Sequence, residues 1–413
     1  MQEQARGDFI LVAYADPRKL SRLNAVLEAA QVLGFKVHIL GLCAETNSCA
    51  DSDVSMVRQN LNPWVNRIRL ALAGLLGSFV SMELGQWMMP YTQPLKRRLR
   101  DKLSKCAAGS TVFIAHWPLA NCLDDLPQGT PVVFDLAELS ATEFIHKPIW
   151  RLTMPGFIKR MEQRLVARAD YLTSVIPNRW LPELLPNLFA IQGQGTGRAA
   201  NDVWFVPNLP SSAALNAAEE TQLDKGEAAR RRARMLYVGS VRPERGIENA
   251  IMALEHLDEE ISFDILGASS PSYQSLLERL AERHGVANRV SFLGAFPSQQ
   301  LVSRLKGYGC SFVAMGNQLP QMQFAQPNKL FQSIAAGVPV VVSPGTLIAE
   351  QLNRTQGFGY VAASDAPKDL AKAIKACFAG AHSSSLPGNL GQFVKSDGAI
   401  SFQQALDQVK HAA

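Results

Sequence analysis

Short apolar runs alternate with helix-period segments along most of this chain, and this alternation constrains the fold more than any other feature. Near the N-terminus, the run 9–13 precedes a segment with Leu and Ala at helical spacing, and the run 37–40 follows it. The alternation resumes at residue 235 and continues to residue 342. Buried strands joined by helices form parallel sheets through right-handed crossovers. The pattern therefore predicts an α/β protein with two Rossmann-like, doubly wound parallel-sheet domains.

The length of 413 residues agrees with two domains, because a single core rarely grows beyond roughly 250–300 residues. We expect an N-terminal domain over 1–208 and a C-terminal domain over 235–385. Residues 209–234 are rich in Ala, Glu, Lys and Arg and poor in large apolar residues. This composition is typical of an interdomain linker and equally of a solvated helical insertion.

The composition excludes several classes of protein. The six cysteines lie far apart, without a CxxC pair or a zinc-like grouping, which is typical of reduced thiols in a cytosolic protein. No basic segment followed by a long apolar run opens the sequence, and no stretch of about 18 apolar residues occurs, so we expect neither a signal peptide nor a transmembrane helix. The net charge of +5 is small.

One short motif points to a metal. Residues Asp51, Ser52 and Asp53 read as D-x-D, a motif that binds a metal-nucleotide complex in some enzymes. Here the motif lies in a polar loop early in the chain rather than after a nucleotide-binding β-α-β unit. We therefore interpret it as ordinary loop chemistry and expect no metal site.

The turn at 239–246 is the first candidate ligand site. Gly239 follows the apolar run 235–238 and lets the backbone turn tightly and approach a ligand closely. Arg245 can donate paired hydrogen bonds to a diphosphate, and the helix expected at 247–257 favours an anion at its start. An ordinary loop with solvated arginines explains the same residues.

The second candidate is the segment 326–341. Pro327 starts a helix there, Asn328 lies at its entrance, and Lys329 could reach a phosphate. The small residues 335–337 permit close packing on a strand. A plain helix packed on the sheet accounts for those small residues, but not for the exposed Pro-Asn-Lys entrance.

These two segments resemble family 4 glycosyltransferases of the GT-B fold. Residues 239–246 resemble the family's G-x-x-x-x-x-K-G loop, and residues 327–341 resemble its P-x-K-L-F-E-x-x-A-x-G-x-P-V-V segment. Five further segments match in the family's order, namely 135–139 (D-x-H-E-l), 162–174, 206–208 (v-x-PN type) and the strand-Gly segments 263–267 and 290–294. The resemblance covers roughly residues 110–380.

The resemblance implies two domains that face each other, a nucleoside-diphosphate-sugar donor held mainly by the C-terminal domain, and a last helix near 402–409 that packs back on the N-terminal domain. Arg245 occupies the position of a diphosphate-binding lysine, and Gln332 that of a glutamate that holds the donor ribose. The implied transfer is retaining and needs neither metal nor cofactor. The donor-binding candidates are Gly239, Ser240, Arg242, Arg245, Gly246, Gly267, Phe292, Leu293, Gly294, Asn328, Lys329 and Gln332. The catalytic candidates are Arg245, Lys329, Glu138 and His116.

The sequence departs from the family pattern at several of these positions. Ser240 replaces an arginine, for which Arg242 could substitute, while Phe324 and Gln332 replace two glutamates and Ala137 replaces a histidine. These departures leave open a degenerate, non-catalytic partner or binding subunit, and a nucleotide-sugar epimerase is a third reading. His116 could face the cleft, although a packed surface histidine is the simpler interpretation.

The segment 64–105 suggests how the acceptor is reached. An apolar stretch that contains Trp87 precedes a basic cluster that includes Lys96, Arg97, Arg98 and Arg100. Apolar surface beside basic residues is typical of a monotopic protein on an anionic leaflet, where each basic residue contributes on the order of 1 kcal/mol. We expect a cytoplasmic enzyme that associates peripherally with the inner face of the plasma membrane and uses a lipid-linked or glycan acceptor in envelope or exopolysaccharide assembly. A core helix followed by a solvated basic helix remains the alternative, and nucleic acid is a poor partner because the rest of the chain is nearly charge-balanced.

Overall fold

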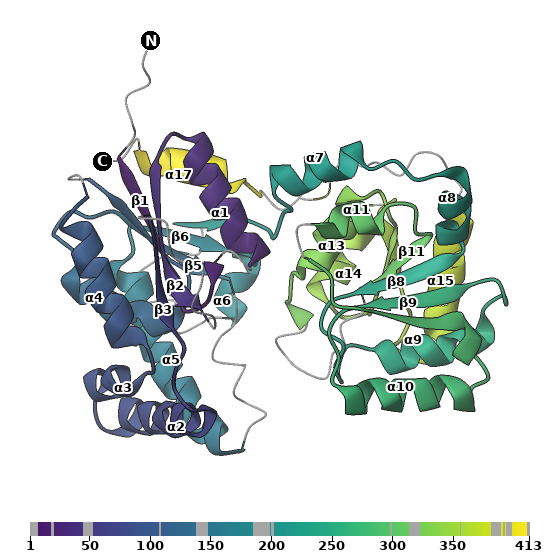
Figure 1. Ribbon diagram of the computed structural model, residues 1–413, viewed down its shortest axis with the longest axis horizontal. Coiled ribbons are helices and arrows are strands. Elements are labelled where there is room, and N and C mark those ends of the chain that lie inside the picture. The colour runs from purple at the N-terminus through teal and green to yellow at the C-terminus, as the bar shows by residue number, and fades with distance from the viewer. Residues whose placement is uncertain are drawn as a thin grey trace, which may run out of the picture. The chain divides into compact units, whose positions relative to one another are not determined.

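The computed structural model describes residues 7–17, 20–43, 53–106, 109–137, 148–184, 199, 202–297, 300–313, 323–355, 357–380, 390, 393 and 399–410. The chain divides into two compact units, residues 1–207 with 397–413, and residues 208–396. Each is a parallel sheet with helices on both faces (Figure 1). The predicted fold class, two Rossmann-like parallel-sheet domains, is confirmed.

The described part of the first unit contains a seven-stranded sheet in the order β3-β2-β1-β4-β5-β6-β7. Its strands are β1 (Asp8–Val12), β2 (Lys36–Cys43), β3 (Val54–Arg58), β4 (Thr111–Ile114), β5 (Val132–Leu136), β6 (Tyr171–Ser174) and β7 (Val203–Phe205). Its helices are α1 (Ser21–Val32), α2 (Pro63–Phe79), α3 (Met82–Met88), α4 (Thr92–Leu103), α5 (Pro148–Arg168), α6 (Leu181–Leu184), α17 (Phe402–Lys410) and the 3₁₀ segments η2 (Trp117–Asp125) and η4 (Asn178–Trp180). Every residue of β1 is buried, because helices cover both faces of a parallel sheet.

The C-terminal helix α17 belongs to the core of the first unit. It packs against α1 on one face of the sheet, while α4, α5 and η2 cover the other face. The ring centres of Phe402 and Phe113 are 6.2 Å apart, and the guanidinium of Arg22 lies 4.7 Å from the centre of the Phe402 ring. Residues distant in sequence therefore complete one core.

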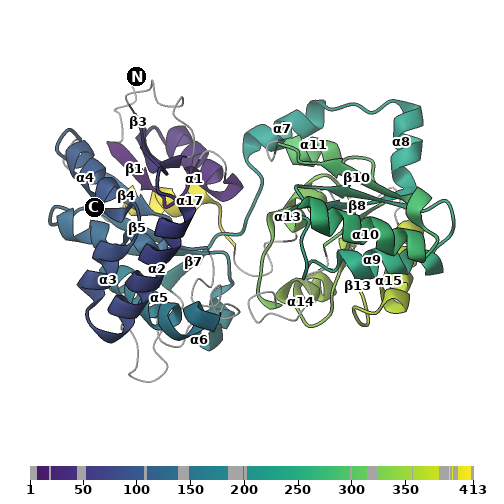
Figure 2. The ribbon, with the colours of Figure 1, turned by 60° about the horizontal axis from the view of Figure 1, so that its bottom comes forward.

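The described part of the second unit contains a six-stranded parallel sheet in the order β10-β9-β8-β11-β12-β13. Its strands are β8 (Arg234–Val238), β9 (Ser262–Leu266), β10 (Val290–Gly294), β11 (Cys310–Phe312), β12 (Val340–Val342) and β13 (Gly359–Val361). Its helices are α7 (Ser212–Glu220), α8 (Lys225–Arg232), α9 (Ile247–Ala253), α10 (Pro271–Arg283), α11 (Leu301–Leu305), α13 (Asn328–Ala335), α14 (Leu347–Arg354), α15 (Pro367–Gly380) and the 3₁₀ turns η6 (Leu254–His256) and η7 (Ala287–Arg289). Helices α9, α10 and α15 cover one face and α11 and α13 the other (Figure 2).

The residues expected as a linker or helical insertion form α7 and α8, and both belong to the second unit. Helix α7 packs against α11. The buried guanidinium of Arg231 in α8 donates to the carbonyl oxygens of Arg304 and Lys306 at 3.1 and 2.9 Å. Few large apolar residues were needed, because Ala214, Ala218 and this arginine make the contacts.

Candidate functional site

The strand order places a switch point in each sheet. Successive strands run outward from β8 in one direction and from β11 in the other, so the loops that follow β8 and β11 diverge at the carboxyl ends of the strands. The corresponding point in the first sheet lies between β1 and β4. Ligands of open α/β sheets bind at such points. The predicted donor loop 239–246 follows β8, and the segment that follows β11 leads to Lys329 on α13.

Two glycines bring the ends of β8 and β9 into close contact. Gly239 has φ +129°, and its N–H donates to the carbonyl oxygen of Leu266 at 3.0 Å. A Cβ on Gly267 would lie only 1.7 Å from the carbonyl oxygen of Gly239. Neither position tolerates an ordinary side chain without a shift of the backbone. Both predicted glycines thus shape one turn at the carboxyl end of the sheet.

A buried lysine lies against this turn. The Nζ of Lys329 is 4.3 Å from the centre of the Tyr237 ring, and the side chain is 8% exposed. Among the described residues Nζ has no hydrogen-bond partner. The phenol of Tyr237 in turn donates to the carbonyl oxygen of Ser240 at 2.8 Å. A cation–π contact without an acceptor leaves the ammonium group available to an anion.

Burial and mutual repulsion lower the pKa values of the basic side chains at this switch point. Burial and the nearby Arg245 lower the pKa of Lys329 to about 7. Burial, followed by the charge of Arg242, lowers the pKa of Arg245. Burial raises the pKa of Tyr237 to about 12, so its hydroxyl stays protonated. A diphosphate between Lys329 and Arg245 would relieve the repulsion that these cations exert on each other.

The start of α13 adds backbone donors beside Lys329. Pro327 precedes the helix, and no side chain caps its first amides. Ser333 holds the helix to β11 by a hydrogen bond of 2.7 Å to Ser311. Gln332 is buried on the same helix, and Asn328 begins it. The two predicted segments therefore meet at the switch point of the second sheet. Backbone amides at the start of a helix are typical ligands of an anion.

The remaining predicted donor residues lie elsewhere on the same sheet. Phe292, Leu293 and Gly294 end β10, two strands away from β8, with a β-bulge between Phe292 and Gly294. Gly294 has φ +72° and is exposed. Ser240, Arg242 and Gly246 lie in the loop after β8, where Arg242 is exposed and Gly246 has φ +68°. All of these residues follow or end strands at their carboxyl ends.

Sequence reasoning missed two residues near this site. Tyr237, which lies beneath Lys329, was assigned only to a strand. Ser343 follows β12 at the carboxyl end, and its buried Oγ lacks a hydrogen-bond partner among the described residues. A tyrosine one residue before the end of a strand and the Ser-Pro-Gly-Thr sequence after 340–342 are the signals that could have found them.

The switch point of the first sheet has a different character. The backbone N–H of Tyr14, after β1, donates to Nδ1 of His116, after β4, at 3.1 Å. Burial lowers the pKa of His116 to about 4, so the ring is neutral near pH 7 with its proton on Nε2. Asp135 at the end of β5 accepts two hydrogen bonds from the buried Arg22 at 2.7 and 2.6 Å and one from Thr173 at 2.7 Å. Glu138, the remaining catalytic candidate, lies outside the described residues.

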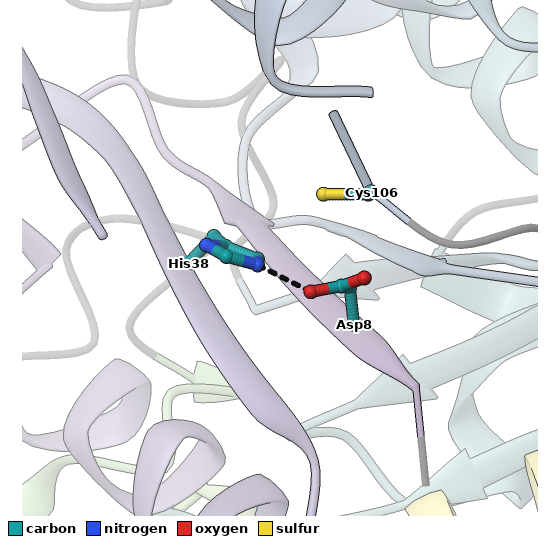
Figure 3. Close-up of side chains that lie close together, drawn as sticks. All are labelled: Asp8, His38 and Cys106. Carbon is teal, nitrogen blue, oxygen red and sulfur yellow. Dashed lines mark hydrogen bonds and ion pairs between the residues drawn. The ribbon is translucent and has the colours of Figure 1, made fainter. Parts of the chain in front are cut away.

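A group of possible metal ligands lies at the opposite, amino end of the first sheet (Figure 3). One atom each of Asp8, His38 and Cys106 lies within 4.8 Å of the others. His38 bridges two carboxylates, with Nε2 2.6 Å from Asp8 and Nδ1 2.9 Å from Asp53. This bridge ties β1 and β2 to the residue before β3, which gives Asp53 a structural role. The expected lack of a metal stays a prediction.

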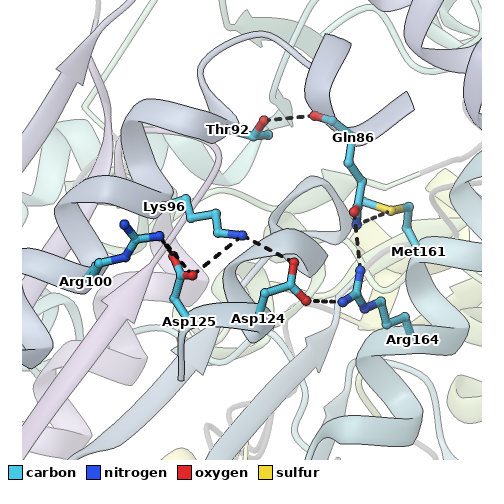
Figure 4. Close-up of polar contacts among 8 residues, drawn as sticks. All are labelled: Gln86, Thr92, Lys96, Arg100, Asp124, Asp125, Met161 and Arg164. Carbon is cyan, nitrogen blue, oxygen red and sulfur yellow. Dashed lines mark hydrogen bonds and ion pairs between the residues drawn. The ribbon is translucent and has the colours of Figure 1, made fainter. Parts of the chain in front are cut away.

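Two of the four basic residues of the predicted membrane patch are ion-paired (Figure 4). Lys96 contacts Asp124 at 3.2 Å and Asp125 at 3.7 Å, and Arg100 contacts Asp125 at 3.0 Å. Arg98 donates to Ser55 at 2.8 Å, while Arg97 is exposed. Within the described ranges, none of the helices has the length and apolarity needed to cross a membrane. Lys96 and Arg100 of α4 thus bind acidic residues of η2.

Comparison with known proteins finds a family match for the second unit and structures of similar fold for the whole chain. The sequence profile of the family described as Glycosyl transferases group 1 matches residues 218–385. No curated protein matches the chain at a significant level. Among solved structures, sucrose-phosphate synthase from Thermosynechococcus elongatus is similar over 98% of each chain, with 14% identity and a TM-score of 0.67. HepE from Anabaena in complex with UDP has 12% identity and a TM-score of 0.61 over 98% of this chain and 100% of its own. An α,α-trehalose-phosphate synthase (UDP-forming) from Burkholderia vietnamiensis has 14% identity and a TM-score of 0.62 over 98% and 100%.

The fold and the profile match define the class of protein, which is a glycosyltransferase of the GT-B fold. More particularly, residues 218–385 of the second unit match the group 1 glycosyl transferase profile, and the solved structures that share the fold are 12% to 14% identical to the chain. The predicted resemblance is therefore confirmed at the level of fold and class.

Proposed function

We propose that the chain transfers a sugar from a nucleoside-diphosphate-sugar donor to a lipid-linked or glycan acceptor in envelope or exopolysaccharide assembly. One observation carries the proposal: beside Arg245 at the switch point of the second sheet, the buried Nζ of Lys329 has no hydrogen-bond partner among the residues that the structure describes. The UDP complex of HepE and the UDP-forming trehalose-phosphate synthase, both similar in fold, make uracil the first base to test.

In the proposed reaction the bond between the sugar C1 and the diphosphate oxygen breaks, and a bond forms between C1 and an acceptor hydroxyl oxygen. The hydroxyl proton leaves to a donor phosphate oxygen or to water. Lys329, Arg245 and the amides at the start of α13 would stabilise the charge on the departing diphosphate, which is the task that a metal performs in other transferases. We propose retention of configuration and independence of metal on the resemblance alone.

Isothermal titration calorimetry with a panel of nucleoside diphosphates and nucleotide sugars, in the presence of EDTA, tests the donor site. We expect one base to bind tightly, and Arg245→Ala to weaken that binding by about tenfold or more, because a charged hydrogen bond contributes about 1.5–3 kcal/mol. Unchanged affinity in Arg245→Ala would show that the diphosphate assignment is wrong. The bound sugar then enters a transfer assay with polyprenyl-phosphate and oligosaccharide acceptors.

A non-catalytic binding subunit is the second candidate, and Gln332 and Phe324 favour it because they replace two family glutamates. Donor binding without hydrolysis or transfer to any acceptor would support that role. Restoring a carboxylate with Gln332→Glu provides the matched variant. We expect it to increase transfer if the chain is an enzyme, and to leave activity absent if it is a binding subunit.

A further inference from the structure

The outer side of α2 and α3 exposes an unusual number of large apolar side chains. Ten of the fourteen exposed large apolar residues among those described lie here. Trp64 is 70% exposed, Phe79 69% and Leu152, on the adjoining α5, 72%. We call this set the apolar face; its members are Trp64, Val65, Ile68, Leu72, Leu75, Phe79, Val80, Leu84, Trp87 and Leu152. Contiguous exposed apolar surface of this kind marks an interaction site.

Helix α2 is amphipathic in the reverse sense, with small residues inside and large residues outside. Its buried residues are Ala73, Gly74 and Gly77. A Cβ on Gly77 would lie 2.2 Å from the ring of Phe157, and one on Gly74 2.6 Å from the sulfur of Met154. The helix therefore packs closely on α5 through small residues, and most of its large side chains lie on the outer side. Their exposure is built into the packing, as in helices that associate within lipid.

The flanks of the apolar face are basic. Arg67 lies over the ring of Trp64 at 5.7 Å, and Arg160 of α5 donates to the carbonyl oxygen of Gly77. Arg151 and Lys159 are exposed on the same helix as Leu152. Glu83 is the single acidic residue in the ranges 63–88 and 148–160. Unlike Lys96 and Arg100 of α4, Arg67, Arg151 and Lys159 have no ion-pair partner among the described residues.

We propose that the apolar face inserts into the interface of an anionic lipid bilayer, with Arg67, Arg151 and Lys159 contacting lipid phosphates. Tryptophans favour this depth because the ring is apolar and the N–H is polar. A second copy of the chain fits less well, because a symmetric contact would set basic flank against basic flank. Such a contact would bring the chain to a lipid-linked acceptor, and this role rests on the proposed function. It moves the membrane contact from the basic helix α4 to α2 and α3.

Flotation with vesicles tests this surface on the full chain without any transfer reaction. We expect the wild type to float with phosphatidylcholine–phosphatidylglycerol vesicles and only weakly with phosphatidylcholine alone. The triple variant Trp64→Ser/Ile68→Ser/Phe79→Ser should partition about tenfold or more less strongly. The matched control, Val32→Ser/Leu276→Ser, changes equally exposed apolar residues away from the face and should float like the wild type.

Two further variants test whether α4 or the basic flank of the apolar face contacts the lipid. The variant Lys96→Gln/Arg97→Gln/Arg98→Gln/Arg100→Gln should retain most of its binding, whereas Arg67→Gln/Arg151→Gln/Lys159→Gln should lose its preference for anionic vesicles. Equal flotation of the triple serine variant and the wild type would overturn the proposal, as would a concentration-dependent dimer that the triple variant abolishes in sedimentation. Calorimetry with the nucleotide donor on the same samples reports the donor site separately, so failure of one does not imply failure of the other.

Tryptophan emission gives an independent readout. Trp64 and Trp87 are the two tryptophans of the apolar face. Their burial in the lipid interface should shift their fluorescence emission to the blue when anionic vesicles are added. Trp64→Phe/Trp87→Phe keeps the face apolar and should still float, but it should lose the shift. Loss of the shift without retained flotation, or a shift that persists in this variant, would contradict insertion of α2 and α3.

Discussion

The two sheets carry equivalent switch points that differ in chemistry. In the second unit the point between β8 and β11 gathers Lys329, Arg245 and Arg242, and burial leaves two of these cations with lowered pKa values. In the first unit the point between β1 and β4 holds a neutral His116 bonded to the backbone. The nearby Asp135 is used to bind Arg22. Architecture thus provides two places for a ligand, and the loop residues decide which one attracts an anion.

The largest expected effect tests whether Asp135 is structural. Asp135→Asn leaves the guanidinium of Arg22 buried without its carboxylate, and we expect the free energy of unfolding to fall by about 3–5 kcal/mol. Urea unfolding measures it. The double variant Arg22→Met/Asp135→Leu should recover most of the loss, because apolar replacements of a buried pair are often tolerated. Unchanged stability in Asp135→Asn would mean that the carboxylate serves a ligand instead.

The next effect concerns Lys329 at the second switch point. Lys329→Met removes the charge that faces the diphosphate, so we expect donor affinity to fall by about tenfold to a hundredfold. Without donor the same variant should unfold at a higher temperature, because a buried ammonium with a lowered pKa costs stability. Calorimetry and thermal unfolding give the two values. A variant that loses stability and affinity together would indicate a purely structural lysine.

The pKa of about 7 for Lys329 predicts a smaller, pH-dependent effect. Below this value the free protein already carries the charge. Above it, binding of a nucleotide sugar must take up a proton, so donor affinity should fall by up to about tenfold per pH unit until the raised pKa of the bound state is reached. Titration from about pH 6 to about pH 9 in buffers of different ionisation enthalpy counts the protons. Lys329→Met serves as the control and should lack the slope.

The smallest effect is expected at His116. Its pKa is about 4 in the folded chain and near 6.5 when unfolded, so folding stability is complete above about pH 6.5 and decreases as the pH falls toward 4. His116→Gln can still accept from Tyr14 and should flatten this decrease in denaturant unfolding. Donor affinity at pH 7 should not change. A marked loss of affinity would place a ligand at the first switch point as well.

The sequence predicted the fold well because its signal is local. The apolar runs 9–13, 235–238 and 262–266 form β1, β8 and β9. The edge strands β3 and β13 escaped notice, because polar residues interrupt the sequence VSMVR of β3, while β13 has three residues and contains a glycine that lies close to Val340. Local patterns of this kind carry no information about which strands become neighbours at an edge.

The candidate site was predictable only in part. The motifs indicated Arg245 and Lys329, but the contact between Lys329 and Tyr237 joins residues 92 positions apart and depends on the order of β8 and β11. The membrane contact of the basic cluster around Lys96 stays a prediction, and the pairing of Lys96 and Arg100 with Asp124 and Asp125 arises only on folding. Tertiary pairing of charges is invisible in a linear pattern.

The placement of α17 in the core of the first unit has a consequence for synthesis on the ribosome. The second unit is continuous in sequence, from residue 208 to 396, and can fold once its own residues have emerged. The first unit must wait, since Phe402, Ala405 and Leu406 complete the layer over Phe113. Until residues 402–410 leave the exit tunnel, α1 presents a bare apolar surface, so the unit translated first finishes folding last.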